Sequence, residues 1–115
     1  MKPPAAAPLE QQPDPWFVHA DGLEVKQLDF KKAGWTAAQH VHAFDHLTML
    51  AAGSLRVWVN DDYRGDFRAP QAFLVKAGEA HLFVALEDNT IAYCIHNLHG
   101  KEEPEVLARG ELPKG

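Results

Sequence analysis

The sequence predicts an all-β domain, either a sandwich or a barrel. Short runs of alternating apolar and polar residues follow one another closely, and residues that favour turns separate them. The length of 115 residues fits one domain. Only residues 33–52 could be mistaken for a helix, and their Thr, Val and Phe content and bounding glycines favour strands instead.

Four runs carry the strand patterning. Residues 55–59 and 81–85 alternate strictly, and residues 90–98 form a long β-prone run. Residues 23–30 alternate loosely, because the apolar positions change register after Val25. In the run 55–59 the odd-numbered residues are expected in the core, which leaves Arg56 on the solvent side.

The two ends of the chain differ from the middle. Residues 1–15 hold five of the eight prolines and few bulky apolar side chains, which predicts a flexible Pro/Ala-rich arm. The β-barrel domain is expected at 16–99. Residues 100–115 form a charged, proline-broken C-terminal tail.

Charge and composition exclude several classes of protein. The net charge is −5 and there is no basic stripe, which argues against nucleic-acid binding. No apolar run approaches the ~18 residues of a membrane span. The N-terminus lacks the basic and apolar blocks of a signal peptide. A single cysteine, Cys94, precludes an internal disulfide, so a cytoplasmic location is expected.

Four of the seven histidines are spaced as if they shared one site. His40 and His42 would face the same side of a strand, because side chains alternate with period two. A short bend would return His46 to that side, and His81 would come from a facing strand. Neutral imidazoles bind several divalent transition metals. The spacing alone leaves open a chance cluster, or a helical zinc pair of His42 and His46.

The histidine stretch resembles the first motif of the cupin superfamily. The pattern is a glycine, five residues, His-x-His, three residues, a ligand position, six residues and a glycine. The matching residues are Gly34, His40, His42, His46 and Gly53. His46 stands where the family usually has glutamate.

A second, less specific match surrounds His81, which follows Gly78 after two intervening residues. Lys76 replaces the usual proline of that motif, and Ala85 stands where an asparagine is expected. The resemblance spans about residues 22–98. It implies a small single-domain, RmlC-like jelly-roll β-barrel, the cupin double-stranded β-helix, with one metal inside.

The resemblance implies a mononuclear site with four ligands, His40, His42, His46 and His81. Such an all-histidine site adds no negative charge, so the ion stays a strong Lewis acid that attracts anions. The missing carboxylate favours Fe(II), Ni, Zn or Cu over Mn or Mg. In the alternative, His46 stays off the metal, as in the three-histidine sites of cupin thiol and diketone dioxygenases.

Strand alternation also predicts the residues around the ion. Thr48 and Leu50 share the face of His46, and Phe83 shares the face of His81. Tyr93 is a further candidate, as a hydrogen-bond donor to a metal-bound ligand. No separate acid or base is identifiable from the sequence.

Three functions are consistent with this site. The leading hypothesis is a metal-dependent dioxygenase, an oxidoreductase acting on a small anionic molecule. The alternative is a non-catalytic metal- or small-ligand-binding protein with a structural, sensing or assembly role. A third possibility, a metal-free sugar-binding or isomerase-type barrel, is disfavoured by the four histidines. A homodimer, paired through residues 16–30, is expected from the small size of the domain and from the family.

Overall fold

The computed structural model describes residues 1–98, apart from the side chains of residues 38–40. Nine strands and one short 3-10 turn make up this part of the chain. They are η1 (Leu9–Gln11), β1 (Asp14–Ala20), β2 (Leu23–Phe30), β3 (Thr36–His40), β4 (His46–Ala52), β5 (Ser54–Val59), β6 (Asp62–Arg68), β7 (Gln71–Val75), β8 (His81–Ala85) and β9 (Thr90–Asn97). The described residues contain no helix long and apolar enough to cross a membrane.

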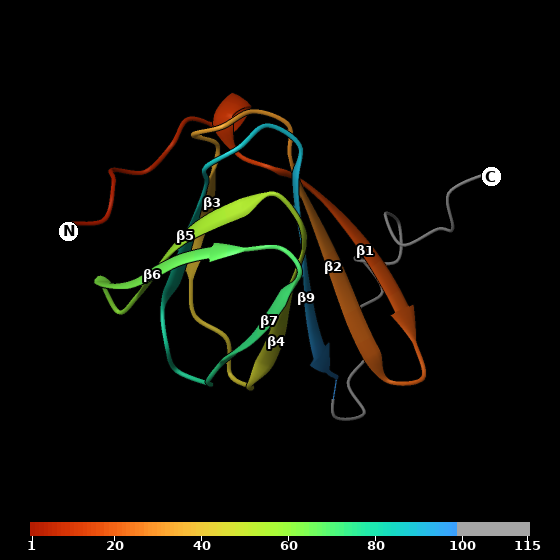
Figure 1. Ribbon diagram of the computed structural model, residues 1–115. Coiled ribbons are helices and arrows are strands. Elements are labelled where there is room, and N and C mark those ends of the chain that lie inside the picture. The colour runs from red at the N-terminus through yellow and green to blue at the C-terminus, as the bar shows by residue number, and fades with distance from the viewer. Residues whose placement is uncertain (99–115) are drawn as a thin grey trace.

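The strands form two antiparallel sheets, one of five strands in the order β1-β2-β9-β4-β7 and one of four in the order β3-β8-β5-β6. The sheets face each other (Figure 1), and a single core cluster draws buried residues from both. The all-β jelly-roll fold predicted from the sequence is therefore confirmed.

Strand β5 shows how alternation builds this core. Leu55, Val57 and Val59 are buried in it, as the sequence predicts. Arg56 lies on the opposite face, where its guanidinium forms a bidentate ion pair with Asp66 at 2.8 and 2.9 Å. Arg56 therefore lies outside the barrel, as the alternation predicts.

Strand β2 corrects one sequence expectation. No register break follows Val25, because β2 pairs without a shift with both β1 and β9. The even-numbered residues face inward along the whole strand, and two of them are the polar Glu24 and Lys26. These polar residues on the inner face disturb the apolar pattern that suggested the break.

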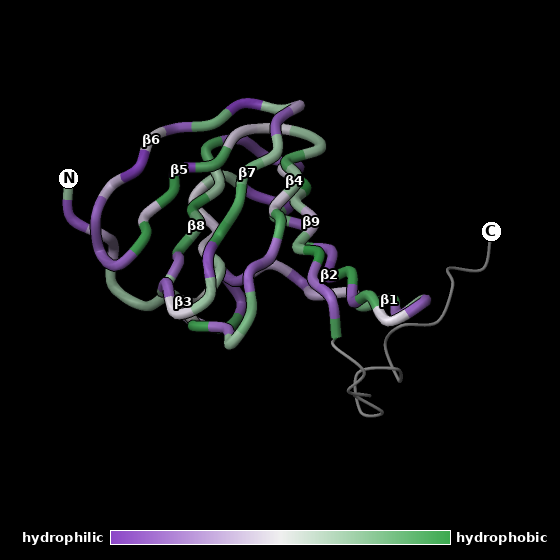
Figure 2. Tube along the Cα trace, turned by 90° about the horizontal axis from the view of Figure 1, so that it is seen from below, coloured by the Kyte–Doolittle hydropathy of each residue, from purple (hydrophilic) through white to green (hydrophobic). Residues whose placement is uncertain are grey.

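The outer face of the five-stranded sheet is unusually apolar. One cross-strand row is entirely aliphatic, and apolar segments, green in Figure 2, occur in each of its strands. We call this set the aliphatic row: Val18, Val25, Ile95, Leu47 and Leu74. Leu47 and Leu74 are 48% and 50% exposed.

The first residue of the chain contacts the four-stranded sheet. The Trp58 indole N–H donates a hydrogen bond to the Met1 carbonyl at 3.2 Å, and the chain then reaches β1, which begins at Asp14. The predicted boundary at residue 16 falls inside this strand. His99 and the predicted tail, residues 100–115, lie outside the described residues.

Candidate metal centre

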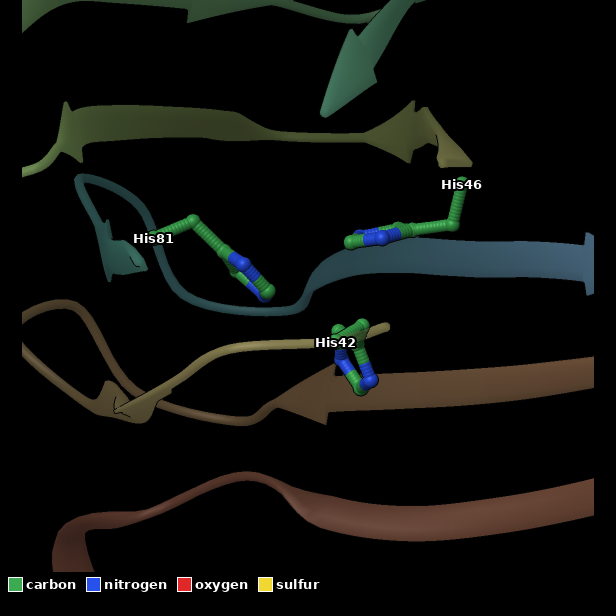
Figure 3. A group of neighbouring side chains, drawn as sticks. All are labelled: His42, His46 and His81. Carbon is green, nitrogen blue, oxygen red and sulfur yellow. The ribbon is translucent and has the colours of Figure 1, made fainter. Parts of the chain in front are cut away.

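Three histidines converge inside the barrel. One nitrogen from each of His42, His46 and His81 can be chosen so that all lie within 4.8 Å of one another. The ring centroids of His46 stand 4.9 Å from those of both His42 and His81. In Figure 3 the rings of His46 and His81 point toward each other, with His42 across from them.

Two of these histidines are the first residues of strands in different sheets. His46 begins β4 and pairs with Val75, and burial alternates along β4 so that His46, Thr48 and Leu50 all face inward. His81 begins β8 and is flanked by Val59 of β5. Both histidines are 3% exposed. The strand ladders thus hold two imidazoles facing each other across the barrel.

His42 reaches the cluster from a loop, which corrects the expectation that it shares a strand with His40. Strand β3 ends at His40, and His42 lies in the loop between β3 and β4. The Gly78 amide donates a hydrogen bond to the His42 carbonyl at 3.0 Å. The Ala77 amide donates to the Asp45 carboxylate at 2.8 Å. These bonds hold the β3–β4 loop against the β7–β8 loop and so position His42.

His40, the fourth predicted ligand, pairs through its backbone with His81. Its side chain lies outside the described residues. The structure therefore brings together His42, His46 and His81, including the histidine that stands at the usual glutamate position.

The three side chains fit a transition-metal ion. Two nitrogens that bind one ion at about 2.0–2.1 Å lie no more than ~4.2 Å apart, so the observed limit of 4.8 Å requires only small rotamer changes. Metal binds the neutral imidazole. Burial lowers the pKa of His42, as do nearby His96 and Lys26, while Glu24 partly offsets them. This environment favours the neutral, metal-binding form of His42.

A cavity of about 240 Å³ opens beside the three histidines. Its walls are largely apolar and aromatic, and they include three polar side chains that the sequence analysis did not select: Glu24, Lys26 and His96. The complete lining is Phe17, Glu24, Lys26, Leu28, Ala37, His42, Phe44, His46, His81, Phe83, Cys94 and His96. The ring of His96 lies 6.0 Å from that of His42.

Glu24 links two further histidines at this cavity. Its carboxylate Oε2 lies 3.3 Å from His96 Nε2 and 3.8 Å from His19 Nε2. All three side chains are at most 14% exposed. Spacing within either motif could not reveal this cluster, since its members come from β1, β2 and β9.

The predicted pocket residues fall in different places. Phe83 lines the cavity. Thr48 and Leu50 face inward but are fully buried outside its lining, and the Thr48 hydroxyl lies 3.9 Å from the Cys94 sulfur. Tyr93 does not line the cavity, contrary to expectation. Cys94, the next residue of β9, faces the cavity, so alternation turns the Tyr93 side chain to the outer face of the sheet.

No protein-family model matches this chain, and a search of curated proteins finds no match. Solved structures do match it. KdgF from a Halomonas species aligns with a TM-score of 0.63 and 19% identity, over 76% of this chain and 78% of that one. An RmlC-like cupin with a double-stranded β-helix fold from Methanocaldococcus jannaschii gives 0.66 and 10%, over 85% and 87%.

A third match is a conserved protein with a double-stranded β-helix domain from Klebsiella pneumoniae, with a TM-score of 0.68 and 16% identity, over 84% and 85% of the two chains. At such identities the likeness concerns the fold. This chain has the double-stranded β-helix fold of the cupin superfamily, as the histidine motif indicated. Within that fold it carries a cluster of three histidines suited to a metal ion.

Proposed function

We propose that this protein is a mononuclear metalloenzyme, a dioxygenase that acts on a small anionic molecule. The observation that carries the proposal is the convergence of His42, His46 and His81 beside an internal cavity. When bound, Fe(II), Ni or Cu supplies Lewis acidity and redox chemistry with dioxygen. Zinc has no redox chemistry and would fit only a non-catalytic role of this site.

The chain contributes binding, orientation and exclusion of water. Three imidazoles add no negative charge, which leaves the full charge of a divalent ion to attract an anionic substrate. Leu28, Phe44 and Phe83 supply apolar walls that keep bulk water from the cavity. The Glu24–His96 pair supplies a candidate acid–base group, because both residues line this cavity without belonging to the three-histidine cluster.

A non-catalytic role is the second candidate, and the depth of the cluster favours it. His46 and His81 are almost inaccessible to solvent, so a metal held there would link the two sheets from inside the core. In that case bound metal would stabilise the fold without turnover.

The metal site is tested by dialysis against limiting Co(II), Ni(II) or Zn(II), followed by elemental analysis. His46→Ala and His81→Ala should each weaken metal binding by about 100-fold or more, because each removes a direct ligand. His19→Ala is the matched control, since it removes a buried imidazole outside the three-histidine cluster. Equal metal content in His46→Ala and wild type would refute the site.

Catalysis is tested separately with protein loaded anaerobically with Fe(II). Oxygen uptake in the presence of small carboxylic acids, lost in His81→Ala, would support a dioxygenase. Stoichiometric metal binding that raises the melting temperature, with no oxygen uptake from any acid, would support the structural role instead.

We also propose that two copies pair through the outer face of the five-stranded sheet, with the aliphatic row at its centre. Five strands at ~4.8 Å spacing and seven residues at ~3.3 Å give a face of roughly 500 Å² per copy. Two such faces reach the roughly 1,000 Å² expected of a specific interface. The exposed Leu47 and Leu74 would be buried by this contact. The sheet face would then contribute more of the interface than the N-terminal strands alone.

A further inference from the structure

Lys26 is the feature of the cavity that the three-histidine cluster does not explain. It lies on β2, and its inward direction places a cation on the inner face of the barrel, where apolar residues usually stand. Its neighbours on that face are Glu24 and Leu28. The side chain is only half-buried, so water solvates the ammonium until an anion enters the cavity and replaces that water.

Among the described residues, no carboxylate lies within ion-pair distance of the Lys26 ammonium. Glu24 instead contacts His96 and His19. The group that Lys26 does contact is the ring of Phe17, whose centroid lies 5.7 Å from the ammonium nitrogen. This cation–π contact fixes the ammonium over an aromatic wall and leaves its hydrogen-bond donors available.

Lys26 and the three histidines line the same cavity. The backbone of Lys26 pairs with that of Cys94 on β9, which holds the lysine on the inner face of the sheet. An anion that entered between Lys26 and the histidines would therefore meet a cation on one side. On the other side it would meet a metal whose charge the imidazoles do not reduce.

We propose that Lys26 binds the carboxylate of a small organic acid whose other end coordinates the metal held by His42, His46 and His81. This proposal rests on the metal site proposed above. The carboxylate accepts hydrogen bonds from the Lys26 ammonium, and the opposite oxygen of the ligand reaches the metal. Lys26 is thus a substrate-binding residue that sets both the charge and the orientation of the ligand.

The cavity limits the ligand to a short monoanion with a compact body. Its volume of about 240 Å³ lies below the ~300–1,000 Å³ of pockets that hold drug-sized ligands. Leu28, Phe44 and Phe83 contribute apolar walls, which suit a ligand with a compact apolar body. A phosphate dianion would face one ammonium and the Glu24 carboxylate, which disfavours it. Short 2-hydroxy or 2-oxo acids match this chemistry.

The test uses Co(II)-loaded protein and two probes of equal size, lactate and its neutral amide, lactamide. Calorimetry gives the affinity, and the visible spectrum of cobalt reports whether the probe reaches the metal. Wild type should bind lactate at least about 10-fold more tightly than lactamide, the gain typical of a charge-assisted hydrogen bond. Lys26→Met should lose about 10-fold for lactate with lactamide unchanged.

Two further variants keep the test decisive. Lys26→Arg retains the charge and should retain most of the preference for lactate. Lys32→Met removes an exposed lysine after the end of β2 and should behave as wild type. Normal cobalt spectra in all variants show that the metal site and the fold are intact.

Distinct results would overturn each proposal. If wild type binds no cobalt, the metal site is wrong, and the role of Lys26 falls with it. If cobalt binds but lactamide binds as tightly as lactate, or Lys26→Met binds lactate as wild type does, only the role of Lys26 is wrong. Failure of cobalt-loaded wild type to bind lactate at all would overturn the short hydroxy acid as ligand class.

Discussion

Gly53→Ala should destabilise the fold much more than an equivalent change at Gly34, although both glycines bracket the same histidine motif. Both have a left-handed backbone, with φ of +78° at Gly53 and +91° at Gly34. An alanine at such an angle costs about 1–2 kcal/mol. The two sites therefore share one penalty and differ only in their surroundings.

The surroundings of Gly53 supply the additional cost. A Cβ there would lie 2.8 Å from Thr90 Cα and would overlap the Thr90 hydroxyl, whereas a Cβ at Gly34 meets nothing within 4 Å. Thr90 is fully buried, and its backbone pairs with Phe30 in the sheet, so it cannot move aside easily. Overpacking of this kind costs about 1–3 kcal/mol. The expected totals are about 2–5 kcal/mol for Gly53→Ala and about 1–2 kcal/mol for Gly34→Ala.

Urea unfolding followed by tryptophan fluorescence measures the difference, with the slope of the transition checked for constancy. In thermal unfolding, each kcal/mol corresponds to a shift of about 4–8 °C for a domain of this size. If the two variants lose the same free energy of unfolding to within about 0.5 kcal/mol, the close approach of Gly53 to β9 does not constrain the fold, and the reasoning fails.

Two further predictions concern other parts of the molecule. Burial raises the pKa of the Cys94 thiol. The thiol of the native protein should therefore react slowly with a disulfide reagent at pH 8, and rapidly once the protein is unfolded in denaturant. Fast labelling of the native protein would contradict this prediction. Because the unfolded thiol loses its proton near pH ~8.5 and the folded one only at higher pH, stability should fall as pH rises above that value, and Cys94→Ala should lack this loss. The second prediction concerns the dimer, which sedimentation should show for wild type and for the control Arg64→Glu. Leu47→Glu should be a monomer, because it places a charge within the aliphatic row. A monomeric wild type at micromolar concentration would exclude the dimer.

The sequence alone determined the fold class and part of the candidate centre. Short β-prone runs bounded by turn residues allowed 55–59 and 81–85 to be predicted as strands without knowledge of their partners. The strict alternation expected there is not matched by burial, because Trp58 and Leu82 are buried on the opposite faces as well. The resemblance to the cupin motifs placed His46 and His81 at metal-ligand positions, and the structure brings both into the three-histidine cluster. Local patterns suffice here because period and turn chemistry are properties of short segments.

Tertiary structure decided what no single segment could determine. Alternation grouped Cys94 with His96 and separated them from Tyr93, but only the pairing of β9 with β2 and β4 shows which side faces the cavity. In β2 the polar Glu24 and Lys26 resembled a break in the pattern, because a strand that lines a cavity does not present only apolar residues on its inner face. The position of His42 was likewise decided by tertiary structure, because hydrogen bonds between two loops, rather than strand periodicity, position its imidazole.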